Sequence, residues 1–316
     1  MLELVKTILF VFGLVALGYF AGLTGFLKLE VGEALTQFAV GVGLPSLLFR
    51  TIATAEFGGS APWGLWITYF LALGIAWAAA FSVLTLGFGR DARNAVVGGL
   101  AACFSNLLML GIPLSLGVYG HDGFSELSLI ISIHLPIVMG LSILMFELLR
   151  PKDLQRRSLS VVLVDFLRKL FANAIVIGIV IGLFWRFSGV PVPALLMRFV
   201  DAFANAAVPV ALFAMGLSLR RFGIGKEMAP VMCLTLCKLI LMPTVALVLA
   251  LVLDLPPLTA KIAVLAAAIP CGINPYLIAT RFGTGQALTS QTMTTSTMLA
   301  VGSTAVWLFI AETVFG

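Results

Sequence analysis

Two polar, proline-containing stretches interrupt the apolar segments of this chain. Residues 104–114 read FSNLLMLGIPL, and residues 269–276 read IPCGINPY. Proline removes a backbone donor and clashes with the preceding helical turn, so each stretch predicts a broken helix. In a bilayer, a break is tolerated only where protein covers it or where it lines a cavity. In a membrane fold, the two stretches therefore predict the position of a site.

The composition places the rest of the chain in a membrane as well. Of its 316 residues, 61% are hydrophobic and 10% are charged, and the mean hydropathy is +1.13. Soluble domains carry about 25% charged residues, so a soluble enzyme, a coiled coil and a disordered chain are excluded. About twenty apolar residues cross a bilayer, and ten apolar runs predict ten spans. The runs are residues 7–27, 34–49, 63–86, 95–119, 127–146, 170–185, 202–219, 228–253, 262–280 and 290–310.

The distribution of lysine and arginine predicts the orientation. When successive loops are assigned to alternate sides, thirteen basic residues fall on one side and five fall on the side of the termini. Cytoplasmic loops are enriched in basic residues, so we expect residues 150–169 in the cytoplasm and both termini in the periplasm of a bacterial inner membrane. The net charge of +5 follows from this bias and does not indicate a nucleic-acid partner.

The two halves share residues at a constant separation of 164 positions. The matched pairs are Gly18 with Gly182, Gly25 with Gly189, Pro45 with Pro209 and Phe49 with Phe213. Because five spans is an odd number, the second half starts on the opposite side of the membrane, as in the inverted repeats of many secondary transporters. We expect residues 1–149 to form the first repeat, 150–169 a cytoplasmic linker and 170–316 the second repeat.

The broken helices are the predicted binding site. A half-helix that begins after a break offers free N–H groups and a positive dipole end, which suit a carboxylate. The predicted substrate-binding residues are Ser105, Asn106, Gly111, Pro113, Gly272, Asn274 and Pro275. The alternative is that these residues only serve helix packing, but their recurrence in both halves favours a site.

Two further side chains are candidates for ion coupling. Lys238 lies inside the eighth run, where a cation is costly and usually functional. It attracts an anionic substrate, replaces a coupling cation as a fixed charge, or reaches the cytoplasmic surface as an anchor. His134, in the fifth run, either lines the cavity or is a satisfied histidine of the helix bundle. Acidic residues lie only near the ends of spans, so a carboxylate-based sodium or proton site is not expected.

The chain lacks the sequence patterns of metal centres and enzymes. Its four cysteines and two histidines have no metal-ligand spacing, and no catalytic signature is present. We therefore expect no cofactor, no metal and no enzyme activity. The serines and threonines of residues 289–297 are expected to bond mainly to helix carbonyls, with substrate contact as the alternative.

Several of these residues together resemble the auxin efflux carrier family. The resemblance rests on Asn106, Gly111, Pro113, Tyr119, Gly120, His134, Lys238, Pro243, Pro270, Asn274, Phe282 and Gly283. It runs nearly from end to end. The short connection at residues 150–169 makes the chain similar to short bacterial members, which are described as malonate or malate transporters.

The resemblance implies a fold and a mechanism. The fold is an all-helical inverted five-plus-five repeat, shared with bile-acid sodium symporters and sodium/proton antiporters. Helices 1, 2, 6 and 7 make a scaffold that forms a homodimer, and helices 3–5 and 8–10 make a transport domain with broken helices 4 and 9 crossing at its centre. The resemblance implies elevator-type transport of organic anions, with Asn106, Pro113, Asn274 and Pro275 in the binding role. The additional Pro270 departs from the family pattern and leaves the substrate open.

The sequence leaves several functions to be distinguished. The first is transport of small mono- or dicarboxylates such as malonate. The alternative is a sodium-coupled symporter of larger amphipathic or aromatic acids. An intramembrane enzyme has no nucleophile–base pair to support it, and a channel or sensor is distinguished from a carrier by saturable counterflow.

Overall fold

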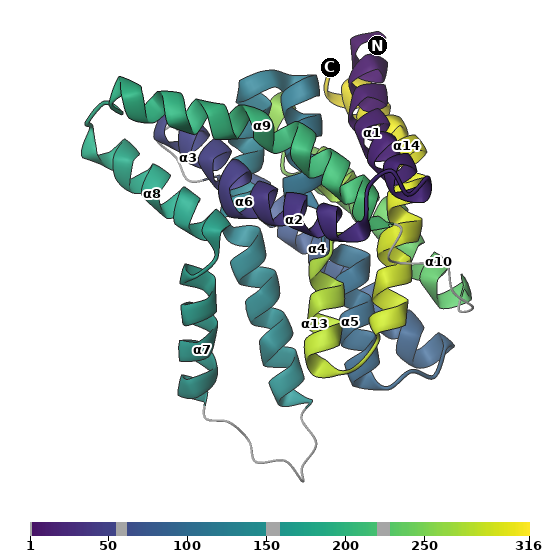
Figure 1. The fold of residues 1–316 in the computed structure, drawn as a ribbon. Coiled ribbons are helices and arrows are strands. Elements are labelled where there is room, and N and C mark those ends of the chain that lie inside the picture. Colours follow the sequence, from purple (N-terminus) through teal and green to yellow (C-terminus); the bar gives the residue numbers. More distant parts are fainter. Residues whose placement is uncertain (1, 55–61, 150–158, 220–227) are drawn as a thin grey trace.

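The computed structural model describes residues 2–54, 62–149, 159–219 and 228–316, which form helices joined by short connections (Figure 1). In chain order the helices are α1 (Leu2–Leu23), α2 (Leu29–Phe38), α3 (Leu44–Thr54), α4 (Trp63–Ser82), α5 (Ala92–Cys103), α6 (Ile112–Leu148), α7 (Leu159–Phe171), α8 (Ala174–Ser188), α9 (Ala194–Leu219), α10 (Met228–Leu236), α11 (Met242–Val252), α12 (Pro257–Ala268), α13 (Asn274–Phe282) and α14 (Gln286–Phe315). Four π-helical turns lie between or after them, namely η1 (Ala39–Gly43), η2 (Val83–Gly87), η3 (Leu107–Gly111) and η4 (Cys237–Leu241).

Seven helical stretches in the described part of the chain are long and apolar enough to cross a membrane. The other three predicted runs, the fourth, sixth and ninth, are interrupted. The prediction of one continuous span from residue 170 is wrong. The helix there ends at Phe171, and Asn173 starts α8 by accepting a hydrogen bond from the Ile175 N–H at 2.9 Å. An N-terminal cap of this kind stabilises a new helix start.

Helix lengths recur along the chain at a separation of 165 residues. Leu29–Thr54 and Ala194–Leu219 each have 26 residues, and Trp63–Gly87 and Met228–Val252 each have 25. The helices α5 and α12 each have 12 residues and begin at positions 92 and 257. The lengths of these three pairs of segments thus recur between the two halves, at a separation one residue longer than that of the matched residues.

The helices pack in two groups. The helices α1, α2, α3, α8 and α9 pack mainly on one another, and α9 lies across α2 and α3 (Figure 1). The helices α4, α5 and α10–α14 form the second group, and α6 contacts both. Salt bridges join helices within each group, with Arg50 and Asp201 3.0 Å apart and Lys261 and Glu312 2.9 Å apart.

Glycines bring helices of the first group together at related positions. A methyl group on Gly18 would lie 2.1 Å from the Phe213 carbonyl oxygen, so α1 and α9 touch through their backbones. A methyl group on Gly182 would lie 3.2 Å from the Phe49 carbonyl oxygen, where α8 meets α3. Gly18 and Gly182 are 164 residues apart, as are Phe49 and Phe213, so the two contacts lie at matched positions in the two halves.

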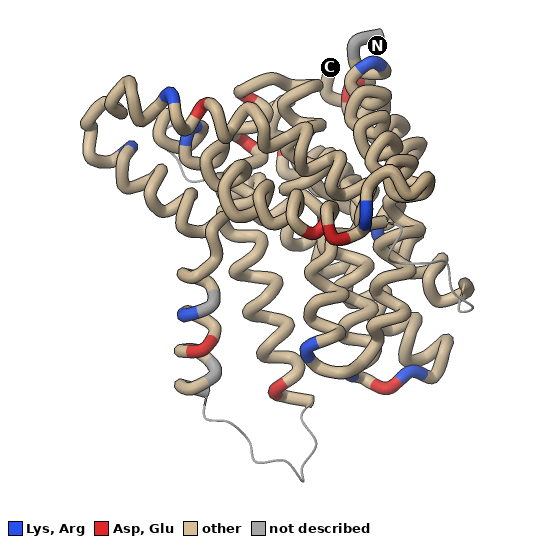
Figure 2. Tube along the Cα trace, in the orientation of Figure 1, with Lys and Arg blue, Asp and Glu red and all other residues tan. Residues whose placement is uncertain are grey.

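The termini lie at one end of the molecule, and the charges lie mainly at helix ends. The N- and C-terminal ends lie at one end, whereas α6 ends and α7 begins at the opposite end (Figure 1). Charged residues are concentrated at helix ends and connections, and most of the chain between them is uncharged (Figure 2). This distribution suits a chain that crosses an apolar layer repeatedly.

Candidate functional site

The two broken helices pair with each other at their breaks. After α5 ends at Cys103 and α12 ends at Ala268, Ser105 and Cys271 form an antiparallel bridge. The Asn106 N–H donates to the Pro270 carbonyl at 2.9 Å, and the Gly272 N–H donates to the Phe104 carbonyl at 3.3 Å. Each break thus satisfies backbone groups that the other leaves free, which is what allows irregular backbone inside a membrane protein.

Side chains near the bridge complete the hydrogen bonding. The Asn106 side chain starts η3 by accepting from the Met109 N–H at 3.4 Å, and its amide nitrogen lies 3.5 Å from the Met215 sulfur of α9. The Cys271 N–H donates to the Ser296 hydroxyl of α14 at 3.2 Å. Most other hydroxyls of residues 289–297 bond to carbonyls of their own helix, as expected.

The prolines do not all break their helices. The prediction that Pro113 causes the first break is wrong, because the helix is interrupted at residues 104–106 and Pro113 lies in the first turn of α6. Pro275 likewise lies in the first turn of α13. In a first turn the missing proline N–H breaks no hydrogen bond. Only Pro270 lies within a break, and its carbonyl accepts the bond from Asn106.

Lys238 reaches the bridge from the eighth run. Its side chain is fully buried, and Nζ lies 2.6 Å from the Ala267 carbonyl, 2.9 Å from the Ser105 hydroxyl and 3.1 Å from the Met242 sulfur. Ala267 is in the last turn of α12, where carbonyls have no partner within the helix. The anchor interpretation is wrong for this structure, because the amine is held inside the protein. Attraction of an anion and replacement of a cation both stay open.

His134 lies in the same buried region. Its Nδ1 is 3.3 Å from the Tyr69 hydroxyl, and its ring centroid is 4.6 Å from that of Phe104. Its Nε2 has no hydrogen-bond partner in the described part of the chain, so only one ring nitrogen is satisfied. Tyr69, which sequence analysis missed, is fully buried and also lies close to Ser105. A tyrosine inside an apolar run needs a partner for its hydroxyl, and that signal could have found it.

Most of the other predicted binding residues lie around the bridge rather than in it. Gly111 is buried at the end of η3, and Gly272 packs against Phe104. Asn274 begins α13, half-buried. Pro113 borders a cavity of about 410 Å³ between α6, α1 and α9. The structure thus brings together Ser105, Asn106, Gly272 and Lys238, and it leaves Asn274, Pro275 and Pro113 on the half-helices that follow.

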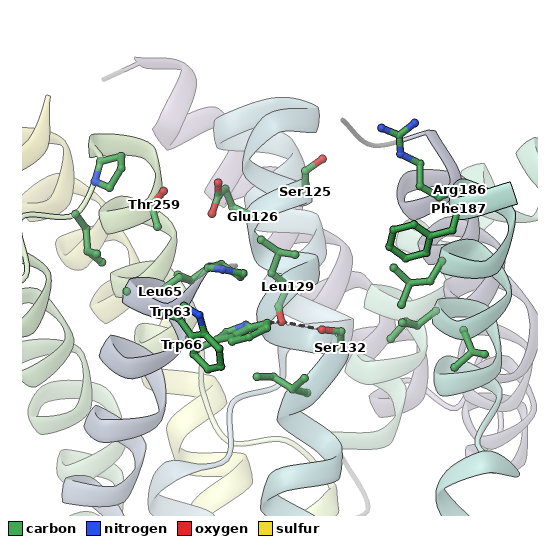
Figure 3. A pocket seen from close by; sticks show the side chains of 18 of the residues that line it. Trp63, Leu65, Trp66, Ser125, Glu126, Leu129, Ser132, Arg186, Phe187 and Thr259 are labelled. Atoms are coloured by element: carbon green, nitrogen blue, oxygen red, sulfur yellow. Dashed lines mark hydrogen bonds between the residues drawn. The ribbon is translucent and has the colours of Figure 1, made fainter. Parts of the chain in front are cut away.

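A larger cavity of about 1160 Å³ lies between α8 of the first helix group, α4 and α12 of the second, and α6 (Figure 3). None of the predicted site residues lines it. Trp63 and Trp66 contribute aromatic walls, and the Trp66 indole N–H donates to the Leu129 carbonyl at 3.0 Å. Glu126 lies beside Thr259, whereas Arg186 lies across the cavity on α8 (Figure 3). The cavity therefore combines aromatic surface with a separate cationic group.

Comparison with known proteins identifies the family. A family model described as "Membrane transport protein" matches residues 3–308. The chain belongs to this family. The match covers nearly the whole chain and confirms the resemblance to auxin efflux carriers. The chain is therefore a multi-pass membrane transporter and not an enzyme.

Individual relatives agree with this assignment. The chain is 26% identical over 319 residues to a "Putative malonate transporter" of Rhizobium meliloti. The aligned residues cover 98% of this chain and 96% of the relative. It is 22% identical to an "Uncharacterized transporter" of Methanothermobacter thermautotrophicus over 96% of each chain. It is 27% identical to the "Lysosomal cholesterol signaling protein" of Mus musculus over 66% of this chain but only 25% of that protein.

Proposed function

We propose that the chain is a secondary active transporter of small organic anions, mono- or dicarboxylates such as malonate. The observation that carries this proposal is the buried Lys238 amine at the meeting point of two broken helices. Asn106 and the start of η3 add hydrogen-bond donors beside it. Positive charge and the positive end of a helix dipole suit a carboxylate. The name of the Rhizobium meliloti relative points to the same ligand class.

We infer an inverted five-plus-five repeat of ten spans that works as an elevator. Its halves are residues 1–149 and 170–316, joined by the cytoplasmic linker 150–169. The recurring helix lengths and the equivalent glycine contacts support the repeat. The separate packing of α1–α3, α8 and α9 supports a static scaffold, against which α4, α5 and α10–α14 move with much of α6.

Uptake of labelled malonate into proteoliposomes tests the proposed substrate. We expect saturable uptake, with protein-free liposomes as the control. Imposing pH, sodium and potential gradients separately identifies the driving ion. Absence of saturable uptake under every gradient rejects small dicarboxylates as substrates.

The large cavity favours a second candidate, transport of larger amphipathic or aromatic acids. The rings of Trp63, Trp66 and Phe187 offer apolar surface, and Arg186 offers a charge partner for a carboxylate. For this candidate we expect an aromatic acid to inhibit malonate uptake. The inhibition should be lost in Arg186→Gln but kept in Arg198→Gln. Equal inhibition of both variants argues against it.

Location and assembly are part of the same proposal. We propose a homodimer in a bacterial inner membrane, with periplasmic termini, that binds an organic anion but no nucleic acid. Native mass spectrometry in detergent is expected to give the mass of two 33.6 kDa chains. A C-terminal alkaline phosphatase fusion, which is active only in the periplasm, is expected to be active. An inactive fusion with an intact, membrane-inserted chain reverses the orientation.

A further inference from the structure

We propose that the Lys238 side chain is a tethered cation, which occupies at the paired breaks the place that a bound monovalent cation would otherwise take. The inference deepens the proposed function, because a built-in cation makes sodium unnecessary for transport. That the Lys238 amine occupies a cation position, however, does not depend on which substrate is transported. The argument rests on the contacts of Nζ and on the charges around it.

The contacts of Nζ match those of a bound cation. A protonated lysine has three N–H donors, and three acceptors surround Nζ, from Ala267, Ser105 and Met242. Unwound backbone carbonyls and the C-terminal ends of half-helices are the groups that coordinate sodium in transporters with broken helices. Here a carbonyl of the last turn of α12 and the hydroxyl of the opposite break coordinate the amine instead. One side chain thus links both breaks.

No carboxylate shares this environment in the described part of the chain. The elements packed against η4 are α4, α5, α10, α11, α12 and α14, and Glu312 of α14 is the one acidic residue among them. Glu312 is bonded to Lys261 at 2.9 Å. The other titratable groups near Lys238 are Cys103, Cys271 and His134, and none of them is a carboxylate. The positive charge is therefore balanced by helix-end carbonyl dipoles rather than by a carboxylate.

This arrangement predicts different effects for different substitutions of Lys238. Lys238→Ala removes the amine and leaves its oxygen acceptors unpaired beside a small cavity, so a free ammonium or sodium ion can replace the amine. Lys238→Met also removes the charge but fills most of the space. Lys261→Ala removes a lysine of the neighbouring helix that is paired with a carboxylate, and it serves as the control.

The experiment measures thermal unfolding of purified protein in detergent, with ammonium, sodium or choline chloride at constant ionic strength. We expect the unfolding temperature of the wild type and of Lys261→Ala to be the same in all three salts. We expect ammonium or sodium to raise the unfolding temperature of Lys238→Ala in a saturable way. The unfolding temperature of Lys238→Met should be the same in all three salts. In proteoliposomes, Lys238→Ala should lose about tenfold or more of its uptake and recover part of it with ammonium.

The outcomes separate this inference from the proposed substrate. A folded Lys238→Ala that responds to none of the cations overturns the tethered-cation inference, even if malonate is transported. Cation rescue of thermal stability without malonate uptake supports the inference and rejects the substrate. If Lys238→Ala does not fold, uptake by the wild type is measured with choline in place of sodium. Loss of wild-type uptake in choline also overturns the tethered-cation inference.

Discussion

Asn106 shows how much a single side chain does at the paired breaks. Its backbone N–H bonds to the other break, its side-chain oxygen starts η3, and its amide nitrogen contacts α9. Asn274 begins the corresponding half-helix in the second half of the chain. Both are candidates for binding substrate with side-chain donors, and a substitution can separate that role from helix capping.

We predict that Asn106→Ala or Asn274→Ala abolishes malonate uptake while the protein still folds. Each change removes a donor but opens only a small cavity, and loss of the cap that Asn106 provides costs about 1 kcal/mol of stability. Asn173→Ala is the matched control, since Asn173 also caps a helix, α8, but lies away from the breaks. Uptake near that of the wild type in both test variants places the binding site elsewhere.

We predict that Tyr69→Phe destabilises the protein by about 1–3 kcal/mol, because it leaves the buried Nδ1 of His134 without its partner. Thermal unfolding measures the effect. Tyr19→Phe, at a half-buried tyrosine of α1, is the control and should change stability little. Equal unfolding temperatures for the two variants would show that the bond between Tyr69 and His134 adds nothing to stability.

At the scale of elements, backbone contact between helices holds the first helix group together. In the membrane, small residues allow close approach and dispersion contacts stabilise it. Gly216 of α9 faces the Val15 carbonyl of α1, and Gly178 of α8 faces the Pro45 carbonyl of α3. The added methyl of an alanine would lie 1.9 Å and 2.6 Å from these oxygens, so each glycine is required by the packing.

We predict that Gly18→Ala lowers the free energy of unfolding by about 1–3 kcal/mol, because α1 and α9 must move apart. The control is Gly13→Ala on the same helix, where a methyl group meets nothing within 4 Å. At that position alanine should be neutral or stabilise the helix by about 0.5–1 kcal/mol. Thermal unfolding of both variants measures the two effects. Equal stability of the two variants contradicts the close contact of α1 with α9 at Gly18.

At the scale of the whole molecule, the two helix groups must move relative to each other if the carrier is an elevator. The first helix group contacts α6, much of which is proposed to move with the second group, where the Thr7 hydroxyl of α1 donates to the Gly117 carbonyl of α6 at 3.1 Å. A Cβ atom at position 117 would lie 3.6 Å from that of Thr7. This separation falls within the range of about 3.5–4.5 Å that disulfides require.

We predict that Thr7→Cys combined with Gly117→Cys forms a disulfide that blocks uptake in proteoliposomes. Reduction should restore uptake to the level of the reduced double variant. Each single cysteine variant is a control for oxidation of the native cysteines, and neither should respond to oxidant. Full uptake by the oxidised, cross-linked protein contradicts relative movement of α1 and α6 during transport.

The sequence by itself determined the membrane class, the family, most span positions and the two regions where helices break. The membrane class, the spans and the break regions depend on local hydropathy and on backbone hydrogen bonding within one segment, so a single segment is enough to predict them. The family follows from residues spread along the chain. In the sequence, the similarity of the two halves was visible only as matched glycines, prolines and phenylalanines. The recurring helix lengths became visible in the structure. The position of the first break was not predicted, because proline in a first helical turn does not interrupt the helix.

Only the tertiary structure decided which side chains meet at the breaks. It brings Lys238 from the eighth run to Ser105 of the fourth and Ala267 of the ninth, and it places Tyr69 of the third run against His134 of the fifth. Such contacts join segments that are 29 to 133 residues apart in the chain. They follow from how whole helices pack, because a buried amine or hydroxyl bonds to whatever acceptor the neighbouring helices supply.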